Sequence, residues 1–345
     1  MSLPETYIDG FHDKKAVEKM PYRKLGNTGL TISKIGFGGG SVSGLYNDFT
    51  ENEAIETIRD AIKRGINYID TAPYYGQGRS EAIIGKALNG VPRNSFYLST
   101  KVGRYTKEWE TMFDYSAEKV TRNLEESMRL LGTDYIDIVV VHDVEFGDMN
   151  QIITETIPAI RRQVELGKVR YIAISGYPIQ TLWDIVQESQ IPIDVVLTYC
   201  RDTLIDNTLH QFIPLFKEKG LGLISAAPTS MGLLTNDGPP AWHPANSETK
   251  KLCAQAAQYC KQNDVELGRL AVYHAMKNEN CDNILVGNNN KSLLDSNIEI
   301  AIHQISEKEL EVLNYLYKTY FQLKDNMHWE GLEVAAYKTY MNTKQ

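Results

Sequence analysis

Short apolar runs alternate with amphipathic segments from about residue 35 almost to the end of this 345-residue chain. The runs are typical of strands, and the segments between them carry apolar residues at helical spacing. We expect strands at residues 35–38, 68–70, 97–101, 136–142, 171–175, 195–199, 222–226 and 283–286. Regular alternation predicts parallel strands, and eight such units close into a barrel. The predicted fold class is α/β, a (β/α)8 TIM barrel, with a doubly wound open sheet as the alternative.

The segments outside this alternation are interpreted as additions to the barrel. Residues 1–21 are polar and are expected to form an irregular N-terminal arm. Two short runs around the sequence 26–29 predict a hairpin between residues 22 and 35, and extra helices are expected at the C-terminal end. No linker or shift in composition divides the remainder, so residues 22–345 are expected to form a single domain.

Composition argues against several classes of partner. The 44 acidic residues outnumber the 36 basic ones and no basic patch appears, so nucleic acid is not an expected partner. No apolar run is long enough for a membrane span. The four cysteines include no C-x-x-C pair, which argues against a zinc site and a disulfide framework, and no bound metal is expected. Because the first residues lack the features of a signal peptide, we expect a cytoplasmic protein.

The glycine-rich run from Gly36 to Gly40 invites comparison with a dinucleotide-binding fingerprint. That fingerprint needs glycines at its first, third and sixth positions, directly before a helix. Here the sixth position is Ser41, and the next helix is expected only near Thr50. We therefore interpret these glycines as a tight loop that stays small near a pocket.

Four proton-handling side chains follow three successive expected strands. Asp70 ends the first of these strands and Tyr75 lies in the loop after it, while Lys101 and His142 end the next two. The carboxyl ends of parallel strands share one face, so we expect the four side chains to meet there. A neighbouring lysine should lower the pKa of the tyrosine. The set suits proton transfer at an oxygen during a reaction at carbon.

These residues resemble the motifs of the aldo-keto reductases, barrel enzymes that reduce carbonyls or oxidise alcohols with a nicotinamide cofactor. Residues 70–81 are similar to the first family signature, 99–101 to its lysine strand and 134–142 to its histidine strand. The resemblance covers the chain from about residue 22 to the final helices. It implies that Tyr75 is the general acid–base, that Lys101 and Asp70 tune it, and that His142 orients the reacting oxygen.

The resemblance also implies a cofactor site. Its expected residues are Ser175, Gly176, Ala227, Pro228, Gly232, Leu233, Gly287, Asn288, Lys291 and Asn297. Gly176 replaces the family's asparagine beside the nicotinamide amide, and Leu197 and Ala226 replace its glutamine and ring-stacking tyrosine. Where members that prefer NADP carry lysine and arginine, this chain has Gly287 and Leu293, so a 2′-phosphate would lack a bidentate partner. NAD is the expected cofactor, and NADP is possible through Lys291.

Polar and aromatic side chains in the loops are the expected substrate contacts. The candidates are Tyr46, Tyr74, Arg104, Tyr105, Asp143, Tyr199, Arg201, Trp242 and His243. Loop stretches at 142–147, 155–159 and 231–244 resemble members that oxidise sugars, which implies oxidation of a hemiacetal such as that of L-galactose to its lactone. An NADPH-dependent reductase of aldehydes or ketones, steroid-like ones included, is the first alternative. A cofactor-binding regulatory subunit of potassium channels is the second, and the oligomeric state is left open.

Overall fold

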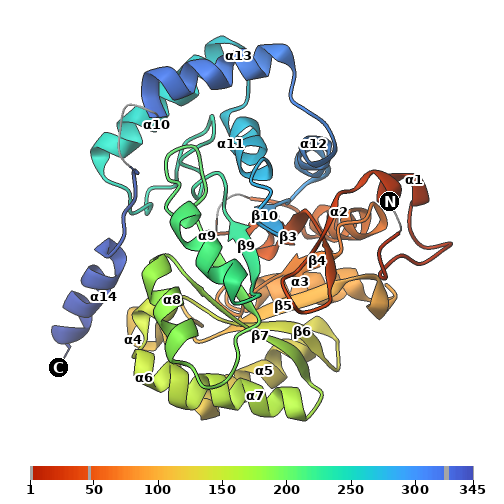
Figure 1. Ribbon diagram of the computed structural model, residues 1–345, viewed down its shortest axis with the longest axis vertical. Helices are drawn as coiled ribbons and strands as arrows, with labels where there is room; N and C mark the ends of the chain where they lie inside the picture. The colour runs from red at the N-terminus through yellow and green to blue at the C-terminus, as the bar shows by residue number, and fades with distance from the viewer. Residues whose placement is uncertain (1–2, 46–47, 322–325, 345) are drawn as a thin grey trace.

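The computed structural model describes residues 3–45, 48–321 and 326–344, and it confirms the (β/α)8 barrel (Figure 1). Eight parallel strands close in the spatial order β10-β3-β4-β5-β6-β7-β8-β9, which excludes an open sheet. All eight expected strands are present. Their bounds are β3 (Ile35–Gly38), β4 (Tyr68–Asp70), β5 (Tyr97–Val102), β6 (Ile136–Val141), β7 (Val169–Gly176), β8 (Val195–Tyr199), β9 (Gly222–Ala226) and β10 (Asn283–Gly287).

Helices cover the outside of the barrel, and several additional ones follow β9 and β10. The helices are α1 (Lys14–Lys19), α2 (Glu51–Lys63), α3 (Arg79–Leu88), α4 (Trp109–Met112), α5 (Ala117–Leu131), α6 (Met149–Gln151), α7 (Ile157–Glu165), α8 (Ile179–Glu188), α9 (Leu209–Glu218), α10 (Ser247–Gln262), α11 (Leu267–Met276), α12 (Lys291–Ile302), α13 (Glu307–Leu316) and α14 (Leu332–Asn342). In Figure 1, α10 and α13 project together from one side of the barrel. Tyr259 and Tyr315 stack there with ring centroids 4.0 Å apart.

The barrel interior is filled by residues that alternate along each strand. Side chains from seven strands form one buried apolar cluster: Tyr68, Tyr97, Ile138, Val140, Ala173, Val195, Leu197, Ile224, Ala226 and Leu285. Leu25, Leu30 and Ile32 of the hairpin belong to the same cluster. The expected hairpin, β1 (Tyr22–Lys24) paired with β2 (Thr31–Ser33), therefore plugs the amino-terminal end of the barrel. The opposite end is left for polar side chains.

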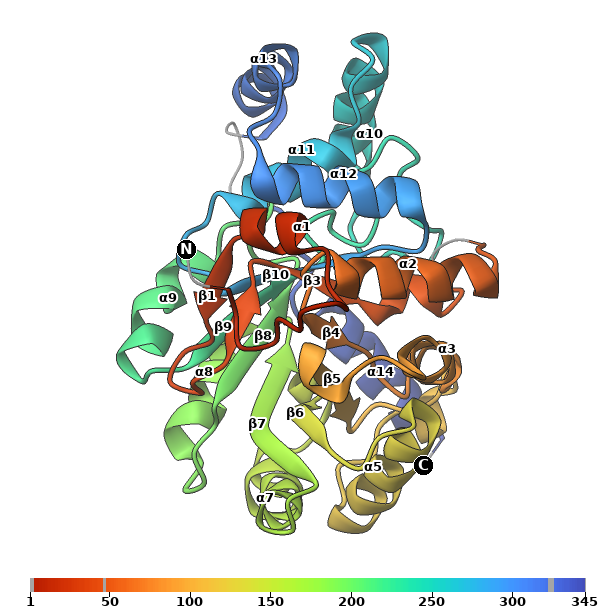
Figure 2. The same cartoon turned by 90° about the vertical axis from the view of Figure 1, so that its right-hand side faces the viewer.

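The N-terminal arm is more ordered than the sequence indicates, because it includes α1. Asn67, at the start of β4, fastens both the arm and the hairpin to the barrel. Its side-chain oxygen accepts a bond from the Ser33 amide at 2.7 Å, and its amide nitrogen donates to the Thr31 carbonyl and to the Thr6 hydroxyl, each at 2.9 Å. Figure 2 shows the hairpin and arm in front of the strands and α14 behind them, at the other end of the barrel.

Candidate active site

The carboxyl ends of β4, β5 and β6 bring Asp70, Lys101 and His142 together. Asp70 lies two residues beyond the interior residue Tyr68 on β4, and His142 two residues beyond Val140 on β6, so the strand alternation points them into the barrel. All three side chains are buried. They share the mouth that lies opposite the hairpin plug.

Tyr75 completes the group from the loop after β4. Its backbone amide donates to the Ala72 carbonyl at 3.1 Å, which turns the chain back over the strand end. The Lys101 ammonium lies 4.9 Å from the centre of the phenol ring. The His142 ring meets the phenol edge-on, with centroids 5.7 Å apart. The structure thus places all four predicted side chains in one cluster.

Lys101 and Asp70 form a direct ion pair inside the protein. The Lys101 ammonium also donates to the Thr71 carbonyl at 2.9 Å, and the other Asp70 oxygen accepts from the Ser99 hydroxyl at 3.0 Å. Gly39 allows this crowding, because a Cβ there would lie 2.7 Å from the Asp70 carbonyl oxygen. Burial raises the pKa of Asp70, while Lys101 and Ser99 oppose the rise. The lysine is therefore fixed rather than free to move.

The expected lowering of the Tyr75 pKa is wrong for the chain by itself. Burial raises this pKa well above 10, and the charges of Asp70 and Asp143 raise it further. Burial is the main cause of the rise, and because Asp70 compensates the ammonium of Lys101, little positive potential is left to oppose it. Tyr75 therefore carries its proton at neutral pH, which is the form needed to donate a proton to a substrate oxygen.

His142 is a neutral imidazole in this environment. Burial lowers its pKa to about 3. The positive charges of Lys101 and Arg104 also lower this pKa, and the negative charge of Asp143 opposes the decrease. Its Nδ1 atom is buried and has no hydrogen-bond partner among the residues that the structure describes. A neutral imidazole has one donor and one acceptor nitrogen, so His142 can bind a substrate oxygen without bringing a charge.

A second ion pair, between Arg104 and Asp143, lies beside the first group. The Arg104 guanidinium contacts the Asp143 carboxylate at 2.6 Å and covers the Tyr74 ring at 3.8 Å from its centre. The Tyr74 ring lies 6.3 Å from that of His142, and one Asp143 oxygen lies 3.7 Å from His142 Nε2. Three of the expected substrate contacts are thus adjacent to the predicted catalytic group.

An aromatic row leads outward from the barrel mouth. The ring of Tyr199, on β8, lies 5.3 Å from that of Tyr177, which stacks on Trp329 at 4.8 Å. Trp329 meets His243 at 4.8 Å, and His243 stacks on the half-exposed Trp242 at 6.4 Å. The sequence analysis missed Tyr177 and Trp329. Trp329 lies 187 residues beyond His142 along the chain, and no local pattern links the two.

The other expected substrate contacts have different settings. Arg201 is buried and forms ion pairs with Asp206 at 3.1 Å and Glu330 at 2.8 Å. Its guanidinium lies over the Tyr177 ring, so Arg201 stabilises the aromatic row. The buried ring of Tyr105 is covered by the Lys119 ammonium at 4.7 Å. Within residues 3–45, 48–321 and 326–344, neither Arg201 nor Tyr105 forms a hydrogen bond, ion pair or ring contact with the predicted catalytic group. Tyr46 lies outside the described residues.

Ser175 and Gly176 end β7 next to His142. The Ser175 hydroxyl accepts a long bond from the Asp143 amide at 3.4 Å and donates to the Val141 carbonyl at 3.3 Å. At Gly176, a Cβ would lie 2.6 Å from one oxygen of Glu145. That oxygen is buried and has no partner within the described ranges, while the other accepts from the Tyr177 amide at 3.0 Å. Glu145, which the sequence analysis did not single out, thus fills the place of a side chain at position 176.

The remaining expected cofactor residues lie after β9 and β10, which are neighbours in the barrel. Ala227 adopts the left-handed backbone conformation, as do Ser230 and Met231, and Gly232 follows with φ of 93°. Pro228 and Leu233 belong to this same turn, in which the Leu233 amide donates to the Ser230 carbonyl at 3.1 Å. The loop therefore bends tightly at the end of β9.

After β10, two asparagines are bound to each other. The Asn297 amide donates to the Asn288 side-chain oxygen at 2.9 Å, and the Asn288 backbone amide donates to the Ser41 hydroxyl at 3.0 Å. Lys291 is exposed and begins α12. Gly287 is also exposed, although a Cβ there would come within 2.9 Å of Ser41. These residues follow the carboxyl end of β10, at the same end of the barrel as the predicted catalytic group.

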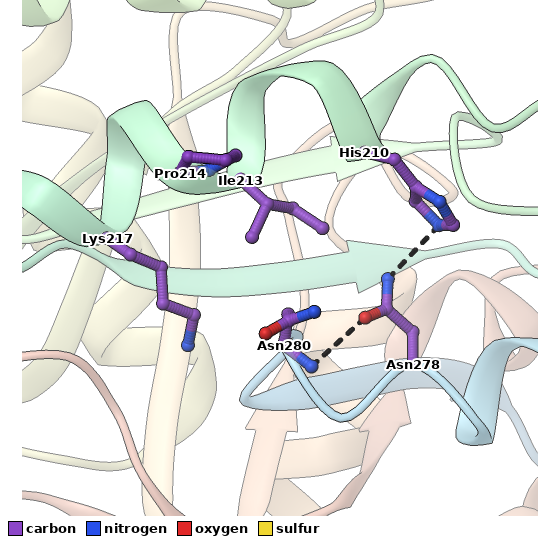
Figure 3. A pocket seen from close by; sticks show the side chains of 6 residues that line it. All are labelled: His210, Ile213, Pro214, Lys217, Asn278 and Asn280. Atoms are coloured by element: carbon purple, nitrogen blue, oxygen red, sulfur yellow. Dashed lines mark hydrogen bonds between the residues drawn. The ribbon is translucent and has the colours of Figure 1, made fainter.

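A separate pocket of about 320 Å³ lies between α9 and the segment before β10 (Figure 3). His210, Lys217 and Asn278 line it, yet each is engaged by a buried carboxylate: His210 and Asn278 by Asp202 at 2.9 Å, and Lys217 by Asp282 at 3.3 Å. These polar groups hold the protein together, and none belongs to the predicted site. Residues 3–45, 48–321 and 326–344 contain no cluster of histidine, cysteine, aspartate or glutamate suited to a metal ion.

Comparisons with known proteins agree with this geometry. Residues 34–318 match the model of the aldo/keto reductase family. The chain belongs to the aldo-keto reductase family. L-galactose dehydrogenase from Arabidopsis thaliana is 40% identical over 285 residues, covering 81% of this chain and 88% of the relative. D-arabinose 1-dehydrogenase from Saccharomyces cerevisiae is 31% identical over 325 residues, covering 87% and 94%.

A solved structure shows the same architecture. The aldo-keto reductase AKR11C1 from Bacillus halodurans, in its holo form, superposes with a TM-score of 0.69 at 26% identity, covering 86% of this chain and 96% of that one. This reductase family member is therefore an oxidoreductase that acts on CH–OH groups, and the family uses NAD or NADP. In the part of the chain that the structure describes, no helix is both long and apolar enough to cross a membrane.

The low pKa of His142 gives a spectroscopic prediction. We expect its imidazole NMR signals to stay constant between pH 5 and pH 9, because a pKa of about 3 leaves the ring neutral throughout. His210 is the control: its bond to Asp202 raises its pKa, so it should titrate above the usual value of about 6.5. Glutamine variants assign the two signals. A His142 titration with a midpoint near 6.5 would show that the site is far more open to water than described.

Proposed function

We propose that this aldo-keto reductase oxidises the hemiacetal of an aldose, such as L-galactose, to the lactone with NAD. The observation that carries the proposal is the Arg104–Asp143 pair, which lies beside the neutral His142 at the barrel mouth. An ion pair offers charged donors and acceptors, which suit the many hydroxyl groups of a sugar. The apolar part of a carbonyl substrate would remove water from the charges of Arg104 and Asp143 without forming hydrogen bonds to them.

The names of the relatives support the same substrate class. Besides the L-galactose and D-arabinose dehydrogenases, D-threo-aldose 1-dehydrogenase from a Pseudomonas species is 26% identical over 303 residues. Each of these names describes oxidation of a sugar. We also propose that the protein works in the cytoplasm, since all four cysteines are buried free thiols, as a reducing compartment permits.

In the proposed mechanism, Tyr75 is the acid–base group. During reduction the Tyr75 phenol donates its proton to the substrate oxygen. In oxidation Tyr75 must first release its proton to solvent, and the phenolate then accepts the proton of the anomeric hydroxyl; the positive charge of bound NAD would favour that phenolate. His142 binds the same substrate oxygen as a neutral partner, and Lys101 is held near the phenol by Asp70. The bound nicotinamide cofactor would supply the hydride acceptor and a positive charge. The buried site keeps bulk water away from these groups.

The residues at the carboxyl ends of β7, β9 and β10 fit the cofactor. Ser175 offers a hydroxyl next to the proposed catalytic group, and the left-handed turn at 227–232 offers backbone amides for phosphate groups. The segment that includes Asn288, Lys291 and Asn297 would then hold the adenosine end. Lys291 is the cation among these three residues; it begins α12 and its side chain is exposed.

The substrate proposal predicts a clear kinetic preference. Steady-state assays should give a higher kcat/KM for L-galactose or a related aldose with NAD than for simple aldehydes with NADPH. Sugar hydroxyls can use Arg104 and Asp143, whereas a simple aldehyde cannot. The reverse order, with aldehydes and NADPH preferred, would instead support the carbonyl reductase alternative.

The role of Tyr75 predicts the effect of removing one oxygen atom. Tyr75→Phe should lower kcat by about 10²–10⁴-fold, the usual contribution of general acid–base catalysis, while the dissociation constant for NADH changes little. Tyr273→Phe is the control, since the Tyr273 hydroxyl bonds to Gln304 at 2.6 Å away from the site. Turnover of Tyr75→Phe at the wild-type rate would remove Tyr75 from its proposed role.

The cofactor proposal predicts that NAD binds more tightly than NADP, by about tenfold or more. A charged hydrogen bond contributes about 1.5–3 kcal/mol, and neither Gly287 nor Leu293 can provide one. Leu293 is 41% exposed, so Leu293→Arg should be tolerated and should improve NADP binding selectively. Fluorescence titration measures both constants. Equal or tighter NADP binding by the wild type would show that Lys291 supplies the missing charge.

A further inference from the structure

The residue after His142 has an unusual backbone conformation. Asp143 has a φ of 50°, in the left-handed region that most residues with a side chain avoid and that aspartate enters more readily than most. This conformation directs its carboxylate toward Arg104, at 2.6 Å, and keeps one oxygen 3.7 Å from His142 Nε2. A strained residue at such a place persists only where its surroundings hold it. A neighbouring group that holds the backbone of residues 142–143 is therefore expected.

Tyr115 is the side chain that contacts this backbone. Its hydroxyl lies 2.8 Å from the carbonyl oxygen of His142 and 2.7 Å from that of Asp143. A phenol has a single hydrogen to donate, so the two carbonyls share it. Both carbonyls are thereby drawn to one atom, which fixes the peptide between them. Tyr115 itself is buried.

The Tyr115 ring is held in a slot between two glycines. A Cβ at Gly103 would lie 2.4 Å from the ring, and a Cβ at Gly147 would lie 2.7 Å from it, so the backbone packs against both sides. The Thr156 hydroxyl donates to the Tyr115 carbonyl and fixes the backbone of Tyr115. The ring therefore cannot shift without moving the loop after β5 or the loop after β6.

We propose that Tyr115 is a positioning residue for the reaction: its hydroxyl holds Asp143 in the left-handed conformation and so holds the Asp143–Arg104 pair beside His142. The inference rests on the proposed function, which assigns the Arg104–Asp143 pair to the binding of the sugar. Tyr115, Gly103 and Gly147 belong to the loops after β5 and β6, whereas most of the proposed cofactor residues follow β9 and β10. Ser175 and Gly176 end β7, and the Ser175 hydroxyl contacts the Asp143 amide through a long bond of 3.4 Å. Loss of the Tyr115 hydroxyl should therefore affect sugar binding much more than cofactor binding.

The test compares Tyr115→Phe with Tyr22→Phe. The Tyr22 hydroxyl donates to the Gly65 carbonyl at 2.9 Å, near the plugged end of the barrel, so both variants lose one hydrogen-bonding hydroxyl. For the best sugar substrate, Tyr115→Phe should lower kcat/KM at least tenfold and leave the NADH dissociation constant within twofold. Tyr22→Phe should change neither. An unchanged kcat/KM in Tyr115→Phe would overturn the proposal.

A double variant separates positioning from general loss of stability. If Tyr115 acts through Asp143, then Tyr115→Phe should change kcat/KM less than twofold when introduced into Asp143→Asn. A full additional loss in that background would show that Tyr115 supports the fold and does not act through the pair.

A structural measurement keeps the proposal independent of the substrate. The crystal structure of Tyr115→Phe should show Asp143 leaving its left-handed conformation or parting from Arg104, and Gly147→Ala, which pushes the ring from its slot, should do the same. An unaltered Asp143–Arg104 pair in both variants would overturn the inference. Absence of sugar oxidation in the wild type would instead refute the proposed function, and the structural result would still decide the role of Tyr115.

Discussion

The ion pair between Lys101 and Asp70 is the interaction on which the rest of the site depends. Two opposite charges are buried where three strands end, and each has further partners, Thr71 for the ammonium and Ser99 for the carboxylate. Loss of Lys101 or Asp70 would leave the other as an uncompensated buried charge, which typically lowers the stability of the fold by about 3–5 kcal/mol. The pair therefore fixes the carboxyl ends of β4 and β5 relative to each other, and Tyr75 and His142 are placed against that frame.

Charge compensation continues across the mouth of the barrel. Arg104 is matched by Asp143, as Lys101 is by Asp70. Burial keeps the two titratable groups proposed to touch the substrate, Tyr75 and His142, neutral. The protonated phenol can donate directly to a carbonyl oxygen in reduction, whereas oxidation needs the phenolate, which the positive charge of bound NAD would favour. This arrangement suits an enzyme of the aldo-keto reductase family, in which the redox chemistry resides in the cofactor.

Much of this structure could be predicted from the sequence, because its strongest signals are local. Apolar runs located all eight strands, and strand ends located Asp70, Lys101 and His142 on a common face. The pKa of Tyr75 could not be predicted, because it depends on burial and on how completely Asp70 compensates Lys101. Tyr115, Glu145 and Trp329 were missed for a related reason. Their positions follow from tertiary packing between distant segments, which leaves no pattern at the residues themselves.

The most direct test of the account is a crystal structure of the enzyme with NAD and an unreactive analogue of the sugar. We predict that the oxygen standing for the anomeric hydroxyl lies about 2.6–3.2 Å from the Tyr75 hydroxyl, within hydrogen-bond reach, and also contacts His142. Other sugar hydroxyls should contact Arg104 or Asp143. A complex in which that oxygen binds away from Tyr75, or in which the nicotinamide lies elsewhere than beside Ser175, would contradict the account.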